Sequence, residues 1–228
     1  MYRQTVIPTQ LGDEISLENF STARNGLLVE ELEKLLKNPG ETRTVYLWGE
    51  PGCGKSHLLN ACCNAKQHRK EPFQFLSMGQ VNSILDIRDR VEPGTLVCLD
   101  DIQNVRGLHE AQDQLLGLYE KVVSLSGSIL ASGNAPLDQV RLELDDLTSR
   151  LSSGGGYPVH ALNDREKMAA LKMRAENRGF ALDDHVIAFI MSHCRRDTGS
   201  LFTLLDKLDS ASLQAKRKVT IPFVRSLL

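Results

Sequence analysis

The sequence is poor in aromatic residues and has no excess of charge of either sign. Aromatic side chains make up 5% of its 228 residues, and 27 Lys and Arg stand against 29 Asp and Glu, a formal net charge of −2. A protein that binds nucleic acid through its own surface usually carries a basic excess, because contacts to phosphate supply much of the affinity. Strong autonomous DNA binding is therefore disfavoured, and we interpret the short basic run at 216–218 as a solvated helix end.

Long apolar runs and paired cysteines are also missing. No stretch approaches the ~20 apolar residues that a membrane span needs, and the N-terminus opens no apolar signal-peptide core. The 5 cysteines include no CxxC pair, so that zinc binding and a disulfide framework are both disfavoured. These absences favour a globular protein of the cytoplasm that has no role at a membrane.

What the sequence does contain is an alternation of short apolar runs with helical or turn-rich segments. Runs of strand length occur at 45–48, 73–76, 96–99 and 129–131, and 159–161 is a candidate fifth. Apolar strands that alternate with helices are typical of a parallel sheet covered on both faces. The sequence therefore predicts an α/β domain with a parallel five-stranded sheet.

After residue 162 the strand signals stop and helical periodicity takes over. Asn163 and Glu166 have the spacing of a capping box, and the leucines of 201–208 recur at i, i+3, i+4 and i+7. A small all-helical domain is predicted there. The expected organisation is a flexible N-terminal arm, an α/β nucleotide-binding domain and a helical lid, over 1–13, 14–162 and 163–228.

One motif in the α/β domain is specific. The pattern GxxxxGK[ST] is matched at every fixed position by Gly49-Glu50-Pro51-Gly52-Cys53-Gly54-Lys55-Ser56, which His57 follows. Backbone N–H groups of such a loop turn toward phosphates, where the N-terminus of the next helix favours negative charge. Lys55 is expected to reach the β- and γ-phosphates and Ser56 to ligate Mg²⁺. We therefore predict a site for ADP or ATP with Mg²⁺, rather than a glycine turn beside an exposed lysine.

A phosphate-binding loop needs an acidic partner on a neighbouring strand. Asp100 and Asp101 directly follow the apolar run 96–99. We predict that Asp100 holds Mg²⁺ and that Asp101 orients or deprotonates the attacking water. Asn134 ends the next strand and could contact the γ-phosphate or its water, although a simple turn over 133–136 is the alternative.

Arg150 is the charge of most interest outside these motifs. It follows a polar helical segment, 145–149, and precedes a Ser- and Gly-rich stretch, 152–156. An arginine there could project from the domain edge into a neighbour's nucleotide site, where such a group accelerates hydrolysis about 10³–10⁵-fold in GTPases. From the residues alone, a surface salt bridge is the commoner outcome.

The order of these motifs resembles the AAA+ ATPases, and within them the DnaA-related proteins and the Hda family of DnaA inactivators. The resemblance extends from residue 14 to the end, and its last two segments are the most specific. The segments that carry it are 46–48, 56–59, 146–151, 171–175, 178–180, 201–209 and 217–224. It implies an AAA+ P-loop fold with a C-terminal helical lid.

The resemblance also implies a function. Members of this family, tethered to the DNA polymerase III sliding clamp and with ADP in their own site, promote hydrolysis of the ATP that the initiator DnaA holds. They act as negative regulators of replication initiation. By this resemblance Arg150 is the arginine finger that enters the nucleotide site of DnaA, and any ATPase activity of the chain itself is weak. Self-association is compatible with this role.

An N-terminal peptide that begins with Gln binds the clamp in this family. The segment 4–9 occupies that place, and Gln4, Ile7 and Pro8 suit it. Val6 is included with them among the expected clamp-binding residues. Thr5 and Thr9 stand where larger aliphatic residues are commoner. DNA would then be reached only through the clamp. The sequence also stops after the lid, where DnaA continues into a DNA-binding domain, which agrees with this expectation.

One position departs from the family pattern. AAA+ initiators usually carry a sensor-2 arginine at the start of the third lid helix, where this sequence has Gly199. We therefore expect stable binding of ADP, weak closure in response to ATP and slow hydrolysis of the chain's own nucleotide. Arg195 or Arg196 would compensate if that helix began earlier.

Two other functions stay open at this point. A helicase-loader-type ATPase of the DnaC class would use Asp101 and Asn134 for rapid turnover and would bind single-stranded DNA. A DnaA paralogue could instead anchor to DNA, with its nucleotide serving only a structural purpose. DNA binding without the clamp discriminates between these alternatives and the regulator.

Overall fold

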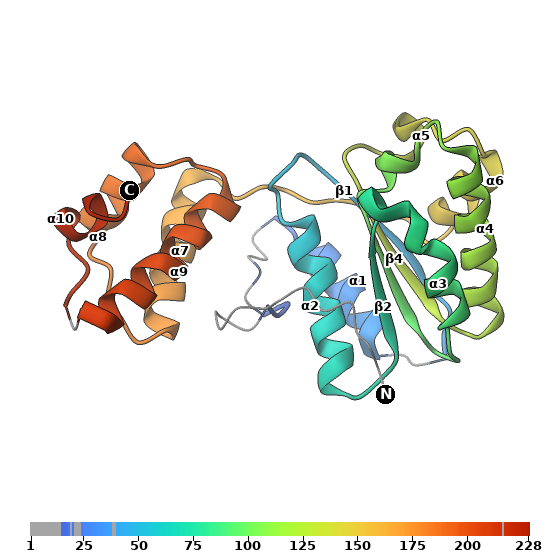
Figure 1. Ribbon diagram of the computed structural model, residues 1–228, viewed down its shortest axis with the longest axis horizontal. Helices are drawn as coiled ribbons and strands as arrows, with labels where there is room; N and C mark the ends of the chain where they lie inside the picture. The colour runs from blue at the N-terminus through green and yellow to red at the C-terminus, as the bar shows by residue number, and fades with distance from the viewer. Residues whose placement is uncertain (1–14, 19, 21–23, 38–39, 216) are drawn as a thin grey trace. The chain divides into compact units, whose positions relative to one another are not determined.

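The computed structural model describes residues 15–18, 20, 24–37, 40–215 and 217–228 (Figure 1). They divide into two compact units, Ile15–Ala161 and Leu162–Leu228, called here the base and the lid. Among the helices of these described residues, none has the length and apolar character needed to cross a membrane.

The base is built on a sheet of five parallel strands in the order β2-β3-β4-β1-β5. Its strands are β1 Thr44–Trp48, β2 Phe73–Ser77, β3 Leu96–Asp100, β4 Ser128–Gly133 and β5 Gly156–Pro158. The central strands are buried along their length, because helices cover both faces of the sheet. The predicted parallel five-stranded sheet is therefore confirmed.

Helices pack on the two faces of this sheet. Those of the base are α1 Gly26–Lys37, α2 Lys55–His68, η1 Met78–Ser83, α3 Ile84–Asp89, η2 Ile102–Val105, α4 His109–Ser124, α5 Leu137–Val140 and α6 Asp145–Ser152. Helices α1 and α2 lie on one face, and α3 and α4 on the other (Figure 1). Adjacent residues of a strand point to opposite faces. Leu47 accordingly packs in the core under α1 and α2, whereas Tyr46 packs in the core under α4.

The fifth strand differs from its prediction. Strand β5 begins at Gly156 and pairs with β1, so the expected run 159–161 lies beyond its end. The turn before β5 passes very close to β1: a Cβ at Gly154 would lie 1.6 Å from the carbonyl oxygen of Thr44. Because any side chain would collide with this backbone, glycine lets the chain turn tightly from α6 into the edge strand.

The segment that enters α1 holds the segment that follows β5. Asn25 is buried, and its side-chain amide donates to the carbonyl of His160 at 3.1 Å and accepts from the N–H of His160 at 2.9 Å. The guanidinium of Arg24 also donates to the carbonyl of Ala161. The chain is thus fixed to the base as far as Ala161.

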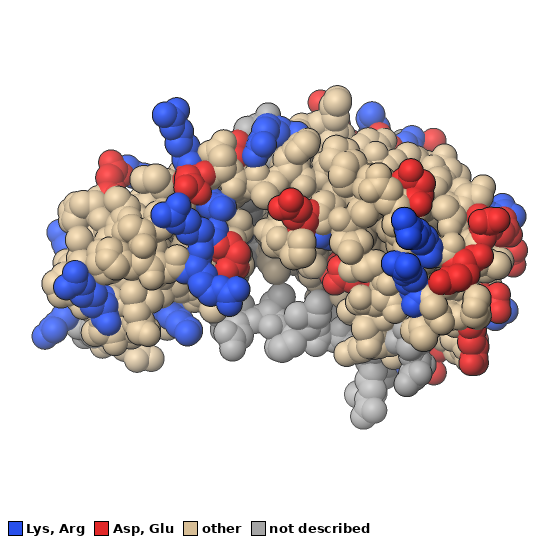
Figure 2. All heavy atoms as spheres, turned by 90° about the horizontal axis from the view of Figure 1, so that it is seen from above, with Lys and Arg blue, Asp and Glu red and all other residues tan. Residues whose placement is uncertain are grey.

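The lid consists of α7 Asp164–Asn177, α8 Asp184–His193, α9 Thr198–Ala215 and α10 Ile221–Arg225. The predicted capping box is confirmed, because Asn163 accepts from the N–H of Glu166 and the Glu166 carboxylate accepts from the N–H of Asn163. Leu201, Leu204, Leu205 and Leu208 are buried in the lid core. The lid carries more Lys and Arg than Asp and Glu, and these basic side chains are prominent on its surface in Figure 2.

Candidate functional site

The phosphate-binding loop connects the end of β1 to the start of α2. Gly54 immediately precedes α2 with φ 112° and Gly52 has φ 79°, both in the left-handed region that favours glycine. The loop is fixed at its start, because the N–H of Gly49 donates to the carbonyl of Gly133 on β4 at 3.3 Å. The loop is therefore held at its start and precedes a helix of 14 residues, whose N-terminus favours a phosphate.

Lys55 lies inside this loop. Its side chain is buried, with 7% of the residue exposed, and its ammonium group donates to the carbonyls of Gly49 at 2.7 Å and Glu50 at 3.1 Å. The Cys53 sulfur lies 3.9 Å from the same nitrogen. Burial raises the pKa of the Cys53 thiol, against the opposing effect of Lys55, so the thiol stays neutral near pH 7. The lysine is the cation available to phosphate oxygens in this loop.

Ser56 and Asp100 meet where α2 begins and β3 ends. The hydroxyl of Ser56 donates to one carboxylate oxygen of Asp100 at 2.6 Å. The other carboxylate oxygen accepts from the hydroxyl of Ser132, a fully buried residue of β4. A hydroxyl and a carboxylate in this arrangement are the hard oxygen donors that Mg²⁺ prefers, usually together with phosphate oxygens and water. This pair fits a magnesium ion bound with a nucleotide.

Asp101 is held directly beside this pair. Its backbone is in the left-handed region, with φ 62° and ψ 56°, and its N–H donates to the Ser132 hydroxyl at 3.0 Å. A non-glycine residue in this region costs about 1–3 kcal/mol and persists only where its surroundings fix it. The conformation turns the chain out of β3 at the carboxyl edge of the sheet.

Gln103 links Asp101 to Asn134. Its side-chain nitrogen donates to the Asp101 carboxylate at 3.0 Å, and its side-chain oxygen accepts from the N–H of Asn134 at 3.2 Å. The structure thus brings the predicted residues Asp100, Asp101 and Asn134 to one edge of the sheet through side chains that the sequence analysis did not select, Ser132 and Gln103. Asn134 itself is exposed.

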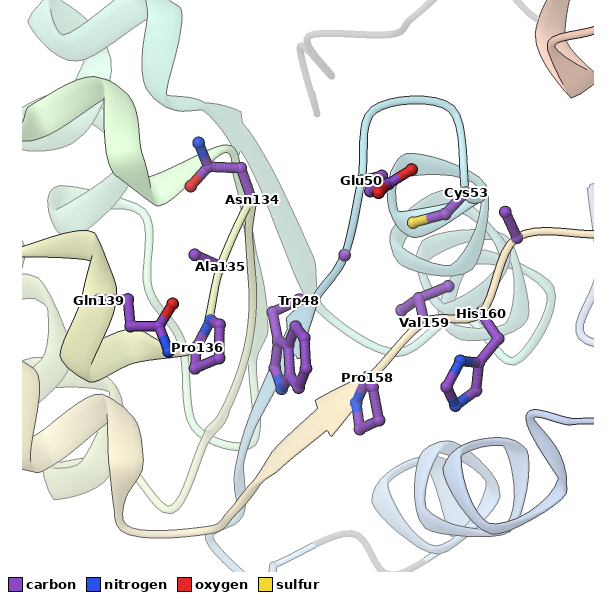
Figure 3. Close-up of a pocket in the computed structure, with 12 residues that line it drawn as sticks. Trp48, Glu50, Cys53, Asn134, Ala135, Pro136, Gln139, Pro158, Val159 and His160 are labelled. Atoms are coloured by element: carbon purple, nitrogen blue, oxygen red, sulfur yellow. The ribbon is translucent and has the colours of Figure 1, made fainter.

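A pocket of about 430 Å³ lies beside the loop (Figure 3). Glu50 and Cys53 line it from the loop, and Asn134 lines it from the end of β4. Trp48 and Pro158 form further parts of its wall, at the ends of β1 and β5. Its size is within the range of small-molecule sites, and it lies at the carboxyl ends of parallel strands, where open α/β sheets bind ligands.

His57 follows the loop, in the first turn of α2. Its ring stacks on Phe20, with centroids 5.9 Å apart and an interplanar angle of 25°. The Phe20 ring also contacts the loop, since a Cβ at Gly54 would lie 2.8 Å from it. His57 was predicted only as part of the cofactor-binding segment, and the structure gives it an aromatic partner from the chain that precedes α1.

Arg150 lies on α6 and pairs with its own helix. Its guanidinium is 3.5 Å from the Asp146 carboxylate, and the two side chains are 50% and 53% exposed. Buried Leu147 and Leu151 anchor α6 to the base. The salt bridge that the sequence left open is therefore present, but Arg150 stays accessible. Its catalytic role stays a prediction.

The lid position with glycine is also defined. Helix α9 begins at Thr198, so Gly199 lies in its first turn and Arg195 and Arg196 precede it. Arg195 pairs with Asp197 at 3.6 Å, and the Arg196 guanidinium donates to the carbonyl of Met191 at 2.9 Å. Both arginines thus have partners within the lid. The predicted clamp-binding residues Gln4, Val6, Ile7 and Pro8 lie outside the described residues.

Solved structures of DnaA and RuvB proteins share this fold. Domain III of Thermotoga maritima DnaA superposes with a TM-score of 0.79 and 18% identity, over 96% of this chain and 98% of that one. AMPPCP-bound DnaA from Aquifex aeolicus superposes with a TM-score of 0.71 and 20% identity, over 90% of this chain and 68% of that one. The Thermotoga maritima RuvB Holliday junction branch migration motor superposes with a TM-score of 0.67 and 17% identity, over 93% of this chain and 70% of that one.

The lid has a more specific relationship. Residues 164–228 match the family model of the Hda lid domain. The match covers the lid, and the likeness of the whole chain to DnaA is one of fold.

Proposed function

We propose that this chain binds ADP or ATP with Mg²⁺ and stimulates hydrolysis of the ATP held by DnaA, as a negative regulator of replication initiation. The observation that carries the proposal is the match of residues 164–228 to the Hda lid domain. The DnaA-like fold and the assembled phosphate-binding loop agree with it.

The chain's own nucleotide would serve to hold its shape. In this proposal Lys55 binds the phosphates, and Ser56 and Asp100 hold Mg²⁺ in the diphosphate complex. Asp101 and Asn134 would give at most slow hydrolysis, because the sensor-2 position is Gly199, which has no side chain to contact a γ-phosphate. AMPPCP in a DnaA of the same fold supports nucleotide binding here.

Arg150 would perform its chemistry in the site of DnaA. There water attacks the γ-phosphorus, the bond to the β–γ bridging oxygen breaks, and ADP and phosphate are released. A guanidinium beside the γ-phosphate oxygens stabilises the charge that develops in this step. The Asp146 pair is no obstacle, because an exposed pair within one helix contributes only about 0.3–0.5 kcal/mol.

The N-terminal segment would bring the chain to the sliding clamp on DNA. Gln4, Val6, Ile7 and Pro8 would bind the sliding clamp as an extended peptide, so that DNA is reached through the clamp. Such a tether raises the effective concentration of the chain near DnaA without adding any contact between the two proteins. A Gln4→Ala variant is expected to bind the clamp more weakly, and undiminished affinity would remove this part of the proposal.

The decisive experiment measures ATP hydrolysis by DnaA on clamp-loaded DNA. Arg150→Ala is expected to lower the stimulation by about 10³-fold. Arg106→Ala is the matched control, because it removes another exposed arginine of the base. Full stimulation by a folded Arg150→Ala variant would overturn the arginine-finger role. Rapid turnover of the chain's own ATP, with tight binding of single-stranded DNA, would instead favour a helicase loader.

A further inference from the structure

Gln112 is a polar residue of α4 that lies in the interior of the base, with 1% of its surface exposed. Its side-chain amide makes four hydrogen bonds. The nitrogen donates to the carbonyl of Val105 at 3.0 Å and to the carboxylate of Glu143. The oxygen accepts from the N–H groups of Glu143 at 3.0 Å and Leu144 at 3.1 Å. A buried amide that is fully paired fixes all the segments that it joins.

Glu143 adds a second connection. Its two carboxylate oxygens accept from the N–H of Gly107 at 3.0 and 3.1 Å. We call Gln112 and Glu143 the clasp. It joins the end of η2 and helix α4, which are neighbours in the sequence, to the chain that enters α6, about 30 positions further on.

The clasp acts on the first turn of the helix that carries Arg150. Leu144 is the residue that precedes α6, and its side chain provides no cap, so the Gln112 oxygen takes the place of a capping group for this turn. The other end of the clasp lies at Val105, the last residue of η2, which directly follows Asp101. The helix is therefore attached at its start to the segment that leaves the candidate metal site.

We propose that Gln112 and Glu143 are positioning residues for Arg150, because they fix the start of α6 and thereby the place of its guanidinium in the nucleotide site of DnaA. The inference rests on the proposed function. Displacement of a catalytic group by about 1 Å can cost roughly 10²-fold in rate. A loosened first turn is enough for such a displacement, since Arg150 is only five residues beyond the N-terminal end of α6.

Glu143→Ala is the variant of choice, because Glu143 is exposed and its removal leaves no cavity in the core. Glu120→Ala is the matched control, because Glu120 is another exposed glutamate of the base and lies on α4. In the DnaA hydrolysis assay, we expect Glu143→Ala to lower the maximal stimulation roughly tenfold. The concentration that gives half-maximal stimulation and the affinity for ADP should stay unchanged. Glu143→Gln, which retains an acceptor oxygen, should recover part of the loss.

Each outcome has a separate meaning. Loss of stimulation by Arg150→Ala, but equal stimulation by Glu143→Ala and Glu120→Ala, overturns the positioning inference and leaves the proposed function intact. Full stimulation by Arg150→Ala overturns the arginine-finger role of the proposed function, on which this inference rests. A Glu143→Ala variant that binds ADP more weakly, or that is partly unfolded at the assay temperature, overturns the inference in favour of a general structural role. Selective loss of maximal stimulation supports it.

Discussion

Replacement of Ser132 by alanine tests the organisation of the candidate metal site. Ser132 is fully buried on β4, and its hydroxyl has two partners. It donates to the carboxylate of Asp100 and accepts from the N–H of Asp101. Ser132→Ala removes both hydrogen bonds and leaves the Asp101 N–H without this acceptor. The carboxylate of Asp100 keeps its hydrogen bond from Ser56.

The expected loss of stability follows from these two hydrogen bonds. A hydrogen bond to a charged group contributes about 1.5–3 kcal/mol, and an unsatisfied buried N–H costs about 1–3 kcal/mol. Since the two effects overlap in one network, we expect the free energy of unfolding of the base to fall by about 2–4 kcal/mol. For a protein of this size the midpoint of thermal unfolding, measured by calorimetry, should fall by roughly 5–15 °C.

The same variant should weaken binding of Mg²⁺ with ADP. Loss of a group that orients a metal ligand typically lowers metal affinity about 10–100-fold. Ser128→Ala is the control, because Ser128 lies at the opposite end of β4 and its hydroxyl accepts from the N–H of Arg43 at 3.1 Å. This control should lose stability but keep its affinity for Mg²⁺–ADP in titration calorimetry. If Ser132→Ala keeps both its unfolding midpoint and its affinity, the reasoning is refuted.

Three further predictions concern exposed groups and cysteines. Asp146→Asn should change the stimulation of DnaA less than about twofold, since exposed helix pairs are weak; a change above tenfold in the same assay would mean that Asp146 restrains Arg150. Hydrogen bonds from Gln112 and Gly107 hold the pKa of Glu143 below its ordinary value. Its carboxylate therefore stabilises the fold above that ordinary pKa, and the contribution is lost as pH falls through the lowered pKa. Glu143→Gln should accordingly show a shallower decline of the unfolding midpoint on acidification, and an identical decline would contradict this account. Burial raises the pKa of the Cys62 and Cys98 thiols, whereas Cys194 is partly exposed; a thiol reagent should label Cys194 first, and mass spectrometry that finds Cys62 or Cys98 labelled in the folded chain would oppose it.

The strands and the larger helices could be predicted because their signals are local. Each central strand is an apolar run of the expected length, and the lid helix with leucines over 201–208 has an unambiguous period. The short helices η1, η2 and α5 were not predicted, because about four to six residues are too few to show a helical period. The fifth strand was placed too late, because Val159 is apolar and buried although it lies just after the edge strand.

The candidate site also contains residues that the sequence predicted and residues that it did not. The phosphate-binding loop and the two aspartates were predictable, because their chemistry demands fixed residue types at fixed spacing. Gln103 and Gln112 were not, since each one's partners include residues about 30 positions away that only the folded chain brings near. A buried glutamine has no sequence signature of its own. For Arg150 the sequence left a salt bridge or a finger open, and the exposed pair with Asp146 is compatible with both.

The hydrogen bonds between Asn25 and His160 have a consequence for the segment that connects the base to the lid. The chain is fastened as far as Ala161, and the capping box of α7 already begins at Asn163. Leu162 is thus the one residue between these two hydrogen-bonded segments. The backbone dihedral angles of Leu162 are therefore fixed by neither of these two sets of hydrogen bonds.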